Sequence, residues 1–219
     1  MNSVSENLQI VHDKIARVAC DYGRNPATVQ LIAVSKQQPA DKIMAALAAG
    51  QRAFGENRVQ EAQQHWRDLK TTYPDLVLHL IGPLQTNKVR EAVRLFDMIE
   101  TVDRADLVRA LAQEMKKQGR TIPCFVQVNT GAEEQKAGIL PEDLSALLSL
   151  CRDEGLEISG LMCIPPVTEP PSLHFAFLRQ LANAHHLANL SMGMTADFEK
   201  AVALGATYVR VGTALFGER

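Results

Sequence analysis

Eight short apolar runs, separated by amphipathic stretches, dominate this chain of 219 residues. Several runs are continuous rather than alternating, as in PCFVQVN and LVLHLIG, which is typical of parallel strands covered on both faces. Strands that alternate with helices predict an α/β protein, either a closed barrel or an open doubly wound sheet. The count of eight favours a single (β/α)8 TIM-type barrel. The predicted strands cover residues 31–35, 52–56, 77–82, 98–102, 123–129, 157–164, 189–194 and 208–213.

The stretches between these runs carry apolar residues at helical spacing, and the clearest are 41–49, 58–70, 104–118 and 141–153. The N-terminal stretch 3–22 is also helical in pattern. The sequence ends soon after the last predicted strand, so we expect no full eighth helix. We therefore expect an additional N-terminal helix to cover that flank of the barrel. No break in composition divides the chain, and we predict one barrel domain over residues 1–219.

Charge and cysteine usage exclude several classes of protein. The formal net charge is −2, which does not favour binding to nucleic acid or to an anionic membrane. The N-terminus has no apolar signal segment, and no run approaches the ~20 residues of a membrane span. The four cysteines form no C-x-x-C pair and no metal-ligand spacing with histidine. We expect a cytoplasmic protein without a metal site.

Lys36 is the first residue that points to chemistry, because it closes the apolar run LIAVSK. In a barrel of this kind, function lies at the carboxyl ends of the strands. Burial lowers the pKa of a lysine and makes its amine nucleophilic, so such a lysine can form a Schiff base with an aldehyde. The alternative is a lysine whose ammonium simply reaches solvent at the end of a strand.

The ends of the last two strands predict a phosphate site. The seventh predicted strand ends in Ser191-Met192-Gly193-Met194, and the eighth ends in Arg210-Val211-Gly212-Thr213. Small residues let backbone N–H groups approach an anion, and the hydroxyls of Ser191 and Thr213 can donate as well. Thr195 is the predicted N-cap of a following helix. The alternative is glycine required for tight packing and hydroxyls that only cap.

Arg210 lies inside an apolar strand and therefore needs a partner. That partner is either a cofactor ring nitrogen or a structural carboxylate. Asn57, His79 and Lys136 also lie near strand ends, but they are weaker signals. An isolated histidine in an apolar run is more often a satisfied core residue than a catalyst.

Seven ordered segments resemble one known family over nearly the whole chain. The chain is similar to the small pyridoxal 5′-phosphate (PLP) homeostasis proteins, which are related to the N-terminal barrel of alanine racemase. The segments are AVSK at 33–36, FGENRVQE at 54–61, HLIGPLQTNK at 79–88, VNTGAEEQKAG at 128–138, GLMCIPP at 160–166, SMGMTADFEKA at 191–201 and VRVGTALFG at 209–217.

The resemblance implies a role for six residues in binding the cofactor PLP. Lys36 carries PLP as a Schiff base, Arg210 faces the pyridine nitrogen, and Asn57 lies beside the cofactor. The phosphate is held by Ser191, Gly212 and Thr213. Two positions depart from the family pattern: Arg58 stands where members often have tyrosine, and Thr195 stands where they often have serine.

The resemblance also implies a non-catalytic function, in which the protein buffers or delivers PLP in vitamin B6 and amino-acid homeostasis. Alanine racemase has a second domain that lends a tyrosine, and we find no convincing second base here. Arg210 cannot accept a proton, which disfavours the use of PLP as an electron sink. The alternatives are a weak PLP-dependent amino-acid racemase and, more distantly, a lysine-dependent aldolase. We expect a monomer whose partners are PLP and apo forms of PLP-dependent enzymes.

Overall fold

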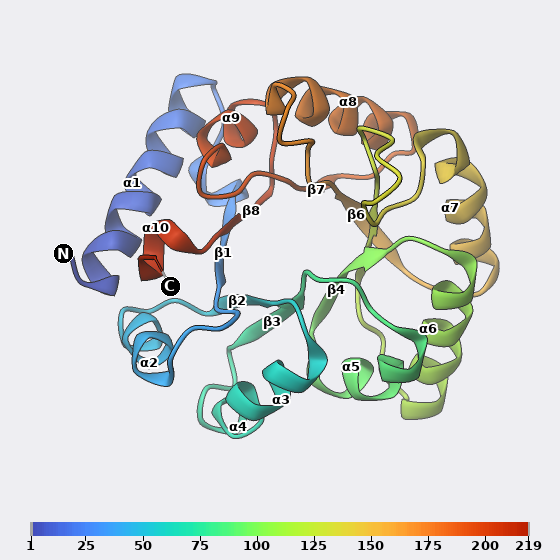
Figure 1. Cartoon of the computed structure of the whole chain (residues 1–219), viewed down its shortest axis with the longest axis horizontal. Helices are drawn as coiled ribbons and strands as arrows, with labels where there is room; N and C mark the ends of the chain where they lie inside the picture. Colours follow the sequence, from blue (N-terminus) through green and yellow to red (C-terminus); the bar gives the residue numbers. More distant parts are fainter. Residues whose placement is uncertain (1, 219) are drawn as a thin grey trace.

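The computed structural model describes residues 2–218, and its eight parallel strands form a closed barrel in chain order (Figure 1). β1 pairs with both β2 and β8, which closes the ring. The predicted barrel is therefore confirmed, and the open sheet is excluded. The strands are β1 Gln30–Val34, β2 Ala53–Glu56, β3 Val77–Leu80, β4 Met98–Val102, β5 Cys124–Gln127, β6 Ile158–Met162, β7 Asn189–Ser191 and β8 Tyr208–Val211.

Helices form a layer outside the strands (Figure 1). The prediction of one helix over 58–70 is wrong, because the chain turns at Arg67 and Asp68 and divides it in two. Trp66 ends the first of these helices, fully buried with its ring centroid 4.6 Å from that of Phe54. The outer helices are α2 Ala40–Ala48, α3 Val59–Trp66, α4 Leu69–Thr72, α5 Val89–Leu95, α6 Ala105–Gln118, α7 Leu144–Asp153, α8 Pro171–Ala184 and α9 Phe198–Ala203.

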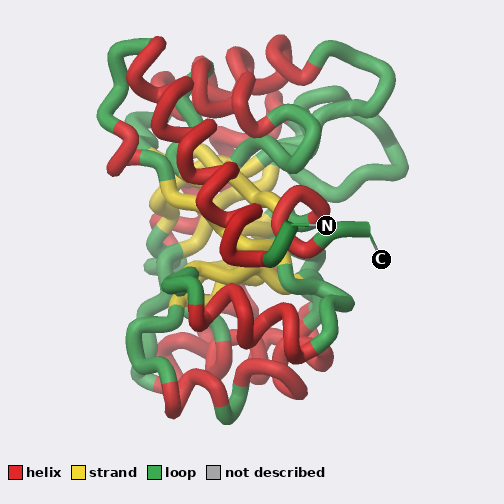
Figure 2. Tube along the Cα trace, turned by 90° about the vertical axis from the view of Figure 1, so that its left-hand side faces the viewer, coloured by secondary structure: helices red, strands yellow, loops and turns green. Residues whose placement is uncertain are grey.

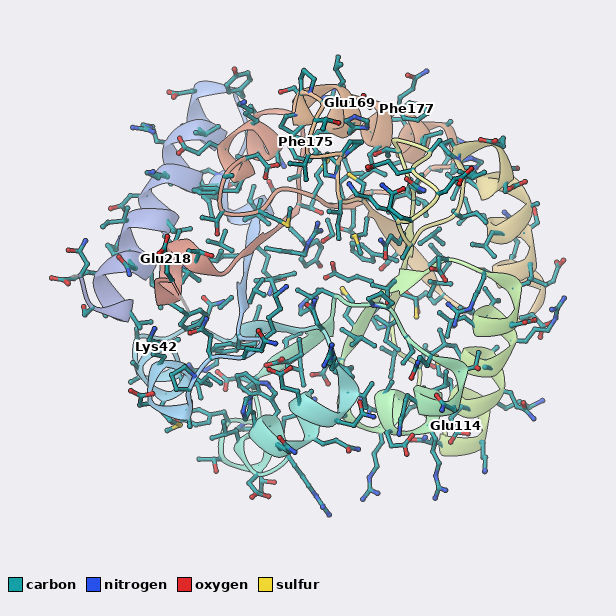
Figure 3. The ribbon with its side chains drawn as sticks, in the orientation of Figure 1. Lys42, Glu114, Glu169, Phe175, Phe177 and Glu218 are labelled. Atoms are coloured by element: carbon teal, nitrogen blue, oxygen red, sulfur yellow. The ribbon has the colours of Figure 1, made fainter. Side chains whose placement is uncertain are left out.

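The N-terminal helix α1, Val4–Asp21, covers the flank beside the eighth strand, as predicted (Figure 2). A capping box between Ser3 and Glu6 starts it, and its buried face is Leu8, Val11, Ile15, Val18 and Ala19. It packs against α2, α9 and the single-turn helix α10, Thr213–Phe216. Lys42 of α2 donates to the carbonyl of Phe216 at 2.5 Å, on the flank where Figure 3 labels Lys42 and Glu218.

Two layers of side chains make up the core. The larger layer lies between the strands and the outer helices and is apolar. The smaller layer lies inside the barrel, where strands that are not neighbours meet. Tyr208 of β8 contacts the rings of His79 on β3 and Phe125 on β5, at centroid distances of 5.8 and 5.5 Å. The barrel interior therefore holds polar groups as well as apolar ones, and the candidate site lies above them.

Within residues 2–218, no helix combines the length and the apolar character that a membrane crossing requires.

Candidate functional site

A cavity of about 310 Å³ lies at the carboxyl ends of the strands, where the barrel architecture places function. Its size is at the lower end for a small-molecule pocket. Five of the six predicted site residues line it, and Ser191 is the exception. The lining is formed by Val34, Lys36, Gln38, Asn57, Ile81, Ile164, Met194, Thr195, Ala196, Arg210, Gly212 and Thr213.

A tight turn directly after β1 presents Lys36 to the cavity. The N–H of Gln38 donates to the carbonyl of Ser35 at 3.0 Å, so the chain reverses around Lys36. Gln37 takes a left-handed conformation with φ of 57°, which is uncommon for a residue with a side chain. A carboxylate oxygen of Glu61, on α3, accepts the N–H of Gln37. Such a strained backbone conformation persists where surrounding contacts hold it, and at Gln37 the turn directs Lys36 toward the cavity.

Asn57 reaches the cavity from the loop after β2, and Gly82 makes room for it. A Cβ atom on Gly82 would lie 2.3 Å from the carbonyl oxygen of Asn57, so only glycine permits this approach. The carbonyl of Gly82 in turn accepts the hydroxyl of Thr101 at 2.9 Å. The loops after β2 and β3 are thereby packed together beside Lys36.

The segment after β8 directs backbone donors into the cavity. The N–H groups of Gly212 and Ala214 both point to the hydroxyl oxygen of Thr195, each at 3.4 Å. The prediction that Thr195 caps a helix is wrong, because α9 begins at Phe198 with Asp197 as its N-cap residue. Asp197 accepts the N–H of Met194 at 2.6 Å, which leaves Thr195 free of the helix and available to the cavity.

Arg210 lies in the floor of the cavity and is 3% exposed. One terminal nitrogen donates to the Ser191 hydroxyl at 2.6 Å, and the other donates to the carbonyl of Cys163 at 2.8 Å. Arg210 therefore has partners, as its burial required, but they are a hydroxyl and a backbone carbonyl and not the carboxylate named as the structural alternative. A guanidinium carries five N–H donors, so these two bonds leave donors for a ligand.

Ser191 lies below the cavity, fully buried. Its hydroxyl donates to a carboxylate oxygen of Glu100 at 2.5 Å, and the other oxygen of Glu100 lies 2.7 Å from Nδ1 of His79. Burial by itself raises the pKa of Glu100. The hydrogen bond and charge of His79, the charge of Arg210 and the bond from Ser191 together hold that pKa below its usual value.

Sequence reasoning missed Glu100. The available signal was a charged residue in the middle of the apolar run MIETV, which requires a partner by the same argument that singled out Arg210. His79 is a buried residue with a partner. Lys136 pairs with Glu133 at 2.5 Å and donates to the carbonyl of Pro165, and it is not among the residues that line the cavity.

A half-buried amine, a fixed guanidinium and converging backbone N–H groups suit a small anionic ligand with an electrophilic carbon. The fold and this site define a class: the barrel proteins of the alanine racemase N-terminal domain type. The family model named "Alanine racemase, N-terminal domain" matches residues 12–219. Within that class, the chain belongs to the pyridoxal phosphate homeostasis protein family.

Curated relatives and solved structures support this assignment. The "Pyridoxal phosphate homeostasis protein" of Pseudomonas aeruginosa is 41% identical, with 100% of this chain and 97% of the relative covered. The protein of that name from Escherichia coli K12 is 38% identical, with 100% and 98% covered. PipY of Synechococcus elongatus, solved with PLP bound, is 42% identical with a TM-score of 0.81, covering 93% of this chain and 100% of PipY. Alanine racemase of Clostridium difficile, 13% identical with a TM-score of 0.74, shares the fold, covering 98% of this chain and 57% of the racemase.

Proposed function

We propose that this protein binds PLP reversibly through Lys36 and buffers or delivers it without turning over a substrate. The observation that carries the proposal is one cavity that joins the Lys36 amine, the Arg210 guanidinium and the N–H groups around Gly212. PLP supplies an aldehyde, which links reversibly to an amine, together with a phosphate group. The PLP-bound structure of PipY and the names of the curated relatives support the choice of this ligand.

The residues of the cavity fit this ligand part by part. The Lys36 amine would hold the aldehyde carbon, and Arg210 would face the ring nitrogen. Gly212 and Thr213, with the Thr195 hydroxyl, would hold the phosphate, because the N–H groups already converge on a hydroxyl oxygen. Asn57 would lie beside the ring. The Ser191 hydroxyl already donates to Glu100, so its predicted role at the phosphate has the least support.

The chemistry of the lining supports a binding function over a catalytic one. Among the described residues that line the cavity, the only titratable side chains are Lys36 and Arg210. Racemisation requires an acid/base group on each face of the reacting carbon, and arginine does not exchange protons. A weak racemase is the second candidate, since Lys36 could act as one of the two bases. Apo forms of PLP-dependent enzymes are the partners that a delivery function requires.

The proposal also includes a cytoplasmic location and a monomeric state. All four cysteines are free, and Cys124, Cys151 and Cys163 are buried, which suits the reducing conditions of a cytoplasm. A monomer suffices for binding, because every group named above comes from one chain. We propose that residues 1–219 act as one unit in this way.

The test begins with an absorbance spectrum of the purified protein, followed by borohydride reduction and peptide mapping. Reduction should fix the label on the peptide that contains Lys36, and Lys36→Ala should abolish both the label and the PLP absorbance. Lys42→Ala is the matched control, because Lys42 is also half-buried but lies on the outside of the barrel. Label found mainly on another lysine would contradict the proposal.

Turnover separates the two candidate functions. We expect no appreciable racemase, transaminase or decarboxylase activity with common amino acids. A strain that lacks the protein should show disturbed vitamin B6 and amino-acid pools rather than the loss of one reaction. Racemisation at an ordinary enzymatic rate of ~1–10³ s⁻¹, abolished by Lys36→Ala, would establish the enzyme instead.

A further inference from the structure

Glu100 is a buried carboxylate outside the cavity lining. The proposed binding of PLP gives it no role. It lies in β4 and is 0% exposed, at a place where an unpaired charge is costly. Its partners come from two other strands: His79 from β3 and Ser191 from β7. Because β4 and β7 are not neighbours in the sheet, the bond to Ser191 crosses the inside of the barrel.

The direction of the hydrogen bonds determines what Ser191 can do. A serine hydroxyl has one hydrogen to donate, and that of Ser191 goes to Glu100 at 2.5 Å. The oxygen of the same hydroxyl accepts from Arg210 at 2.6 Å. No hydrogen then remains for a phosphate oxygen. The hydroxyl instead joins a carboxylate to a guanidinium, with its acceptor side turned to Arg210.

This arrangement holds Arg210 before any ligand arrives. Its two terminal nitrogens are held by Ser191 on β7 and by the carbonyl of Cys163, which directly follows β6. The negative charge of Glu100 compensates the buried positive charge across a single hydroxyl. A charged group held by such preset contacts costs little to order when a ligand binds.

We infer that Glu100 is a positioning residue, which acts through the Ser191 hydroxyl to fix the guanidinium of Arg210 under the ring of the bound cofactor. Ser191 serves this relay and does not bind the phosphate. The inference rests on the proposed function, because it concerns how the PLP ring meets Arg210. The group of residues Glu100, Ser191 and Arg210 is called the relay below.

The relay is tested by titrating the full-length protein with PLP and with pyridoxal, which lacks the phosphate. Ser191→Ala removes the bridge, and it should weaken the binding of both ligands by a similar factor, on the order of tenfold. The absorbance maximum of bound PLP should shift as it does in Arg210→Gln. The double variant should bind no more weakly than Arg210→Gln alone, because the relay acts only through Arg210.

Two results of the binding titrations would overturn the relay. If Ser191→Ala weakened the binding of PLP but not that of pyridoxal, the Ser191 hydroxyl would be a phosphate ligand. If the losses of binding free energy in Ser191→Ala and Arg210→Gln were fully additive, the two residues would act independently. Glu100→Gln should reproduce Ser191→Ala, and where it fails to fold, Ser191→Ala decides the matter. Asp97→Asn is the matched control: it removes the charge of another carboxylate, which directly precedes β4 and pairs with Lys70 at 2.5 Å outside the relay, and it should leave the spectrum unchanged.

A readout without ligand keeps this inference separate from the proposed function. In the protein free of PLP, the side-chain Nε–H signal of Arg210 in a nitrogen-15 NMR spectrum should be sharp and slow to exchange. Ser191→Ala should broaden or abolish that signal, while Thr195→Val should not, because the Thr195 hydroxyl bonds to the N–H groups of Gly212 and Ala214 and not to the guanidinium. An Arg210 signal that is the same with and without the Ser191 hydroxyl would overturn the relay, whether or not the protein binds PLP.

Discussion

Pyridoxal and PLP differ only in the phosphate, so the ratio of their affinities measures the phosphate site. The N–H groups of Gly212 and Ala214 point to one position, now held by the Thr195 hydroxyl oxygen at 3.4 Å from each. A hydrogen bond to a charged group contributes roughly 1.5–3 kcal/mol. Two such donors give roughly 3–6 kcal/mol, and pyridoxal should therefore bind roughly 10²- to 10⁴-fold more weakly than PLP.

The assay is a titration of the protein free of PLP with each aldehyde, followed by absorbance. Both ligands form the same bond with Lys36, so that contribution cancels in the ratio. Thr195→Val and Thr213→Val should each narrow the ratio, because both side chains line the phosphate end of the cavity. Thr207→Val is the control: its hydroxyl accepts the N–H of Leu190 at 2.8 Å, at the far end of β7 and β8, and the ratio should not change.

Equal affinities for the two aldehydes would refute the phosphate site. A ratio that stays wide in both Thr195→Val and Thr213→Val would be compatible with backbone donors alone, and the two hydroxyls would then lose their assigned role. A narrowed ratio in Thr207→Val would mean that general loosening of the last two strands, rather than a specific contact, explains the effect.

Two further predictions concern stability. Ile15→Ala on α1 should cost roughly 2–5 kcal/mol and lower Tm by roughly 5–15 °C, because Ile15 is 3% exposed against the barrel flank. Ile10→Ala, 43% exposed on the same helix, should cost far less, and equal losses in thermal unfolding would contradict the placement of α1. Burial raises the pKa of Glu56 above 4.5 despite hydrogen bonds from Trp66 and Ser35 that lower it. The folded state then binds this proton more tightly than the unfolded state, so stability from Glu56 is lost as pH rises through its folded pKa. Glu56→Gln should flatten the slope of stability against pH just above 4.5 in chemical denaturation, and an unchanged slope would contradict this linkage.

The predicted strands were located well, because strands of a closed parallel barrel are covered on both faces and form continuous apolar runs. The carboxyl ends of β2 and β4 were predicted correctly, but the other six were placed one to three residues too late. The run 77–82 yields β3 over Val77–Leu80, and the run 189–194 yields β7 over Asn189–Ser191. At these ends the chain leaves the ladder of backbone hydrogen bonds to form the mouth of the cavity, and composition does not change where the ladder stops.

The candidate site also has a part that the sequence predicts and a part that it does not. Lys36, Asn57, Gly212 and Thr213 follow strands, and the rule that barrel sites lie at the carboxyl ends of strands is enough to bring them together. The relay could not be found by that rule. Glu100 is a single charged residue in the run MIETV, and no sequence pattern indicates that β4 faces β7 across the barrel.

The amino-acid sequence by itself determined the alternation of strands and helices, the covering helix at the N-terminus and five residues of the cavity lining. These follow from local periodicity and from the position of a residue at the end of a strand, which neighbouring residues reveal. Only the tertiary structure decided that Ser191 lies below the cavity, bonded to Glu100 and Arg210. Closure of the barrel brings together side chains that are 91 residues apart in the chain, and their hydrogen-bond directions depend on that closure alone.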